Sequence, residues 1–108
     1  MAHYLIQASY TTQGVSGLVK SPEDRSVVLR QLVESTGGRI ESMYYAFGES
    51  DVVVILELPD NVAMAALSMA VGASGSVANV RTTVLIPISE GVEAARKAAG
   101  ISYRPPGS

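Results

Sequence analysis

The alternation of apolar and polar positions along the chain predicts four strands separated by helices. Segments dense in β-branched and aromatic residues, each followed by turn residues, are typical of strands. These segments are residues 3–10, 39–47, 51–58 and 77–86. A polar turn at residues 48–50 joins the second and third strands, and so short a connection favours an antiparallel hairpin.

The first helix has the clearest sequence signals. Ser21 is a good N-cap, and Pro22 has its φ angle preset for the first helical position. Apolar residues then recur on one helical face, and the pair Gly37 and Gly38 ends the helix. Residues 14–20, which precede it, are ambiguous and fit one irregular helical turn.

Two more helices are expected further along the chain. One begins at Asp60, a plausible N-cap, and runs to about Gly72. The other is capped at Ser89 and is stopped by Gly100. Residues 101–108 contain two prolines, so we expect them to be an extended arm.

The order of elements is β-α-β-β-α-β with an additional C-terminal helix and tail. This is the order of a ferredoxin-like split βαβ unit, in the α+β class, with an antiparallel four-stranded sheet and both main helices on one face. Residues 1–100 are predicted to form this one domain. We expect the first and third strands to be parallel neighbours, which places His3 and Asp51 near the same end of the sheet.

The third strand is apolar on both of its faces. Val53 and Ile55 lie on one face, and Val52, Val54 and Leu56 lie on the other. Helices cover one face, and the rest of the chain has nothing large enough to cover the second. A homodimer or higher oligomer that stacks sheet on sheet is the economical solution, although a central strand can also tolerate apolar residues on a wet face.

The composition excludes several classes of partner. Only 17% of the 108 residues are charged, against roughly 25% in an average domain, and the net charge is -2. Nucleic acid is therefore not an expected partner, because phosphate contacts need clustered basic residues. The chain has no cysteine and one histidine, so no metal site is expected. The sequence shows no cofactor-binding loop, no signal peptide and no apolar span of ~20 residues, so we expect no cofactor, no membrane partner and a cytoplasmic location.

Short motifs occur at turns and strand ends along nearly the whole chain. They are Thr12-Gln13-Gly14, Ser21-Pro22, Gly37-Gly38, Tyr44-Tyr45-Ala46-Phe47-Gly48, Asp51, Glu57-Leu58-Pro59-Asp60 and Val80-Arg81-Thr82-Thr83. In this order and spacing they resemble the GYD domain family, small bacterial proteins named for a Gly-x-Tyr-Asp motif. The resemblance implies a dimeric α/β-barrel assembly and almost no chemistry. At the motif itself this chain has Ser50 where the family has tyrosine.

Glu57, His3 and Asp51 are the candidates for acid/base chemistry. Glu57 lies among apolar neighbours, and a partly desolvated carboxylate is suited to act as a general base. The simpler interpretation is that Glu57, at its strand end, is hydrated or paired with Arg81. His3 can hydrogen-bond to Asp51 if the two side chains share a face of the sheet.

The ligand-binding candidates are Gln7, Ser9, Tyr44, Tyr45 and Arg81. Gln7 and Ser9 share a strand face on which a few polar groups stand among apolar residues. Such a mixture is typical of a small-ligand pocket and equally of a dimer interface. Tyr44 and Tyr45 point to opposite faces, so only one of them can enter any pocket.

Two functions of different classes remain open on the sequence alone. The first is a homo-oligomeric module that binds a small apolar or aromatic molecule or serves in assembly. The second is a cofactor-free enzyme of the dimeric-barrel kind that acts on a small organic substrate by acid/base chemistry. A second titratable group that converges with Glu57 is the feature that distinguishes the second hypothesis from the first.

Overall fold

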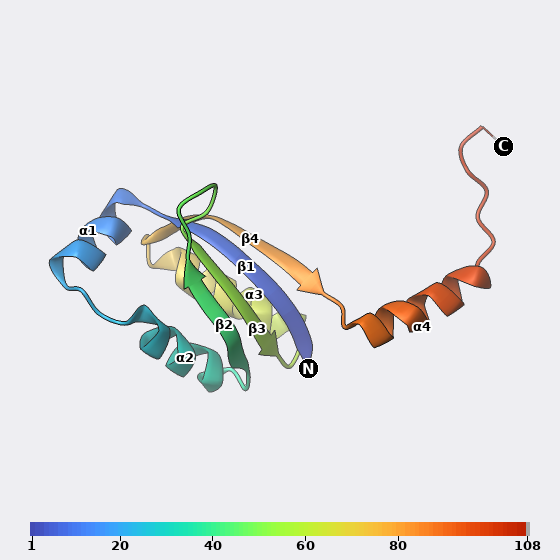
Figure 1. The fold of residues 1–108 in the computed structure, drawn as a ribbon, viewed down its shortest axis with the longest axis horizontal. Helices are drawn as coiled ribbons and strands as arrows, with labels where there is room; N and C mark the ends of the chain where they lie inside the picture. Colours follow the sequence, from blue (N-terminus) through green and yellow to red (C-terminus); the bar gives the residue numbers. More distant parts are fainter. Residues whose placement is uncertain (108) are drawn as a thin grey trace.

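The computed structural model describes residues 1–107, which form an α+β domain with one open, four-stranded antiparallel sheet and four helices (Figure 1). The elements are β1 (Ala2–Tyr10), α1 (Thr12–Lys20), α2 (Arg25–Ser35), β2 (Arg39–Tyr45), β3 (Val52–Leu58), α3 (Asn61–Ala73), β4 (Val77–Leu85) and α4 (Ile88–Ala99). The strand order across the sheet is β2-β3-β1-β4. The predicted α+β class and antiparallel sheet are confirmed.

The core lies between the sheet and helices α2 and α3. Successive residues of β3 alternate between buried and half-buried, as expected for a strand with one covered face. The covered face packs against Val33 of α2 and against Met64 and Leu67 of α3. Tyr4 is fully buried on this face, and its hydroxyl donates a hydrogen bond of 2.5 Å to Oδ1 of Asn61, which fixes the start of α3.

The opposite side of the sheet, which we call the open face, has a regular arrangement of side chains. Paired residues in an antiparallel sheet share a face, so the register defines three rows across the four strands. In strand order the rows are Arg39–Glu57–His3–Leu85, Ser42–Ile55–Leu5–Thr83 and Tyr44–Val53–Gln7–Arg81. The middle of the face is therefore apolar, and both ends carry charged groups.

The expectation that β1 and β3 are parallel is wrong. The two strands pair antiparallel, with His3 opposite Glu57 and Ala8 opposite Val52. The physical reason is that the first crossover returns β2 in the direction of β1, and the β2–β3 hairpin then reverses the chain. Asp51 consequently lies at the far end of the sheet from His3.

The region before the first predicted helix is also different from the prediction. Residues 12–20 form the full helix α1, whose N-cap Thr11 accepts a hydrogen bond of 3.1 Å from the backbone N–H of Gly14. Ser21 is the C-cap of this helix, because its N–H donates to the Gly17 carbonyl, and Pro22 follows as a helix stop. Helix α2 starts later, with Asp24 as the N-cap that accepts from Ser26.

The other helix caps are partly as predicted. Asp60 caps α3 by accepting a 2.9 Å hydrogen bond from the N–H of Ala63, which confirms the sequence prediction. The predicted cap at Ser89 is wrong, because α4 begins at Ile88 and its N-cap position is Pro87, without a side-chain cap. The helix instead starts where the proline fixes the backbone after β4.

Helix α4 projects away from the sheet (Figure 1). Every residue of α4 is exposed, including Ile88 and Val92 on one side of the helix. The radius of gyration is 17.5 Å, against roughly 13 Å for a compact chain of this length. Residues 101–107 continue without a helix or strand. No helix within residues 1–107 is both long enough and apolar enough to cross a membrane.

Candidate functional site

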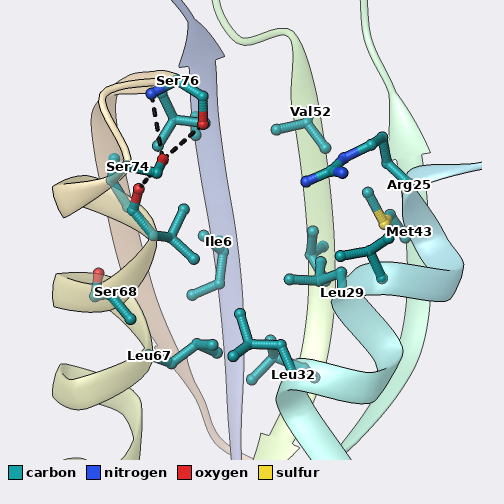
Figure 2. A pocket seen from close by; sticks show the side chains of 18 of the residues that line it. Ile6, Arg25, Leu29, Leu32, Met43, Val52, Leu67, Ser68, Ser74 and Ser76 are labelled. Atoms are coloured by element: carbon teal, nitrogen blue, oxygen red, sulfur yellow. Dashed lines mark hydrogen bonds between the residues drawn. The ribbon is translucent and has the colours of Figure 1, made fainter. Parts of the chain in front are cut away.

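The main cavity lies on the helix-covered side of the sheet, between α2 and α3. Its volume is about 340 Å³, which is within the range of small-molecule sites. Leu29 and Leu32 of α2 face Leu67 of α3 across it, and Ile6 of β1 lies on the floor (Figure 2). The cavity is therefore apolar over most of its length.

Polar side chains gather at one end of this cavity. Figure 2 shows Arg25 extending from α2 toward the gap, with Ser74 and Ser76 across from it. The Ser74 and Ser76 hydroxyls are 2.7 Å apart, and Ser74 also donates a 2.6 Å hydrogen bond to the Val71 carbonyl. Both serines are thus engaged with each other and with the backbone, which leaves Arg25 as the charged group among the lining residues.

Tyr10 lines the same end of the cavity. Burial, followed by the nearby Tyr45, raises the pKa of Tyr10 to about 12. The two rings are 6.3 Å apart and tilted by 56°. The Tyr10 phenol therefore stays protonated across the physiological pH range and remains able to donate a hydrogen bond.

A smaller hollow of about 180 Å³ adjoins this polar end. The hollow is lined by two aromatic and two acidic residues, Tyr44, Tyr45, Glu23 and Asp24. Arg25 lines both the hollow and the main cavity. The two tyrosines do occupy opposite faces of β2, because Tyr44 is opposite Val53 and Tyr45 is opposite Val52. The expectation that only one of them can enter a pocket is wrong, because both line this hollow at the edge of the sheet. Arg25 accordingly stands between an apolar cavity and a hollow with aromatic walls.

Glu57 and His3 come together on the open face. His3 Nε2 lies 3.5 Å from Glu57 Oε1, and the Glu57 side chain is only 13% exposed. Arg39 Nε contacts Glu57 Oε2 as an ion pair that lacks hydrogen-bond alignment. The hypothesis that Glu57 pairs with Arg81 is wrong, because Arg81 pairs with Gln7, four residues along β1 from His3.

Arg81 and Asp51 hold the other end of the sheet together. Arg81 Nη2 donates a 2.9 Å hydrogen bond to Oγ of Ser50, which is buried in the β2–β3 turn. Asp51 Oδ2 accepts a 2.9 Å hydrogen bond from the N–H of Tyr10. Ser9 makes a long hydrogen bond of 3.5 Å to the Glu49 carbonyl in the same turn. These contacts tie the hairpin turn to β1 and β4, and they bring neither His3 nor Glu57 to Asp51.

Within residues 1–107, no three His, Asp or Glu side chains lie close enough together to hold a metal ion. The expectation that the protein has no metal site stays a prediction.

The comparison with protein families identifies the chain. The family model of the GYD domain matches residues 4–95, which is most of the 108 residues. The chain belongs to the GYD domain family. No curated protein matches it. In this GYD domain the motif positions Ser50 and Asp51 bond to β4 and β1 respectively, so both have partners within the fold.

The cavity and Arg25 were not found by sequence reasoning, which looked for a pocket on the open face. None of the ligand-binding candidates Gln7, Ser9, Tyr44, Tyr45 and Arg81 lines the main cavity. One signal was present: Arg25 precedes the apolar positions of α2 by about one turn. That spacing places a cation at the end of an apolar stripe, but it does not show that the stripe faces a cavity.

Replacing Glu57 with glutamine is expected to lower the free energy of unfolding by about 1 kcal/mol. The substitution keeps the shape and removes the partner of Arg39 and His3. Arg39 is 64% exposed, so solvent offsets part of the loss. Urea unfolding at neutral pH measures the change, with Glu41→Gln at an exposed position of the neighbouring strand β2 as the control. A Glu57 variant as stable as the parent would show that the contacts are not structural, and would favour a chemical role for the carboxylate.

Proposed function

We propose that this GYD domain binds a small apolar molecule in the cavity between α2, α3 and the sheet. The observation that supports this most directly is the cavity itself, about 340 Å³ of mainly apolar space in a domain of 108 residues. A cavity of this size with convergent polar groups at one end is typical of a binding site.

Filling the cavity is the direct test of this proposal. We expect Leu29→Trp to weaken binding of the neutral dye Nile red at least tenfold, because Leu29 lines the cavity and the indole occupies its space. The chain has no tryptophan, so the emission of this single indole also reports whether it is shielded from water. Dye fluorescence titration measures the affinity.

Gln31→Trp is the matched control for this experiment, because Gln31 is exposed on the same helix and does not line the cavity. It should bind the dye as the parent does. Absence of saturable dye binding by the parent protein, or equal affinity in all three proteins, would refute the proposed function.

The same proposal includes a homodimer formed through the open face, with the ferredoxin-like topology and dimeric barrel expected from the sequence. The strand order β2-β3-β1-β4 and the antiparallel pairings support this topology. Leu5, Val53 and Ile55 are half-buried at the centre of the face and are not part of the core. The exposed apolar side of α4, with Ile88 and Val92, is a second surface that a partner copy would cover.

A second candidate function is acid/base catalysis at the open face. The observation that favours it is the Glu57–His3 contact, in which a carboxylate and an imidazole lie 3.5 Å apart. Arg39 contacts the same carboxylate. We rank this function below ligand binding, because the ion pair already engages Glu57 and the main cavity lies on the other side of the sheet.

A further inference from the structure

The charge pattern of the main cavity restricts the ligand that it can hold. Arg25 is the charged residue among those that line it, and the guanidinium extends toward the gap at the polar end (Figure 2). The remaining length of the cavity is walled by apolar side chains such as Leu29, Val54 and Leu67. A ligand that satisfies both regions has an apolar body and an anionic group at one end.

The present partner of Arg25 can be replaced. Arg25 Nη1 lies 2.6 Å from Oε1 of Glu23, and the two side chains are 40% and 52% exposed. Exposed ion pairs of this kind contribute little stability, because solvent screens them. A ligand whose apolar body is held in the cavity keeps its carboxylate close to Arg25, so that carboxylate competes with Glu23 for the guanidinium.

The other acids near this end are already bound elsewhere. Asp24 accepts hydrogen bonds from the N–H and the hydroxyl of Ser26, and these bonds lower the pKa of its carboxyl. Asp51 accepts from the N–H of Tyr10. Neither carboxylate is therefore a competitor for Arg25, but their negative charges disfavour a ligand with two charges. A single carboxylate suits this site better than a phosphate.

We propose that the cavity binds monocarboxylic acids with an aliphatic or aryl body, and that Arg25 selects the carboxylate. The ligand body lies between α2 and α3, and its carboxylate takes the place of Glu23 on the Arg25 guanidinium. This inference rests on the proposed function, since it names the ligand class of the same cavity. Tyr10 also lines the cavity.

Displacement of Nile red by three ligands of equal chain length tests the assignment. Decanoic acid, decanol and decyl phosphate differ only in the head group. The parent protein should bind decanoate at least tenfold more tightly than decanol and more tightly than decyl phosphate. In Arg25→Met, which keeps the apolar stem, decanoate should lose this advantage over decanol.

Two further variants separate recognition from disturbed folding. Arg25→Lys keeps the charge and should retain part of the preference for decanoate. Glu23→Gln removes the competing carboxylate and should tighten decanoate binding about threefold, a gain that a damaged fold does not produce. Arg30→Met, on an exposed position of α2 outside the cavity lining, is the control and should change nothing.

The outcomes distinguish the two proposals. If Nile red and decanol bind but decanoate shows no preference that depends on Arg25, the ligand class is wrong and the proposed function stands. If the parent protein binds neither Nile red nor any one of the three ligands, both proposals are overturned. Tighter binding of decyl phosphate than of decanoate would show that the site selects phosphates instead of carboxylates.

Discussion

Ile55→Glu is expected to convert the proposed homodimer into folded monomers, with a dissociation constant raised at least 1000-fold. Ile55 lies in the middle row of the open face, next to Leu5 on β1 and Ser42 on β2. In the proposed dimer the glutamate is buried without a partner, which costs several kcal/mol, and every 1.4 kcal/mol is about tenfold in affinity. In the monomer the same side chain reaches solvent, so the fold is retained.

Sedimentation and light scattering at micromolar concentration measure this effect. The control is Val19→Glu, the same kind of exchange at a 75% exposed position of α1 outside the open face, and it should remain dimeric. A parent protein that is a stable monomer at these concentrations would refute the dimer. An Ile55→Glu variant that stays dimeric would show that another surface, such as the apolar side of α4, forms the interface.

The features predicted correctly from the sequence depend on local patterns. The alternation along β3 could be recognised because side chains of a strand point to opposite faces in turn. The Asp60 cap could be recognised because a cap needs only the carboxylate and the N–H groups of the next turn. The opposite placement of Tyr44 and Tyr45 follows from the same strand geometry.

The errors arise where contacts between distant segments decide the structure. Thr11 can cap α1 because its N–H and hydroxyl are bonded to Ser76 and Gly75, more than 60 residues away in the sequence. Because α1 forms, Ser21 lies at the end of a helix. The residue type and the proline that follows it are instead typical of a helix start. Local signals alone could not distinguish these two roles.

The candidate site likewise depends on contacts between distant segments, which local sequence patterns do not reveal. The sequence singled out Glu57 and His3, and the structure does bring them together, but through an antiparallel pairing that had not been expected. Arg25 could not be recognised, because its role depends on how far α2 stands from α3. That separation is set by the packing of both helices on the sheet, and no residue of α2 alone determines it.

Gly38→Ala is expected to destabilise the protein by about 3 kcal/mol and to lower its melting temperature by at least about 10 °C. An added Cβ would overlap the Glu57 carbonyl oxygen and would lie 2.5 Å from Cδ2 of Leu58. Because one of these neighbours is backbone, β2 and β3 must move apart where Arg39 meets Glu57.

Gly17→Ala is the matched control, since it is the same substitution but is expected to stabilise the protein. Gly17 is inside α1, and nothing lies within 4 Å of a Cβ added there. Alanine is a better helix former than glycine, so this variant should gain up to about 1 kcal/mol. Thermal and urea unfolding of the parent and both variants measure the two changes. If Gly38→Ala were as stable as the parent, the close approach of β2 to β3 would not limit the fold, and the position of Arg39 against Glu57 would need another explanation.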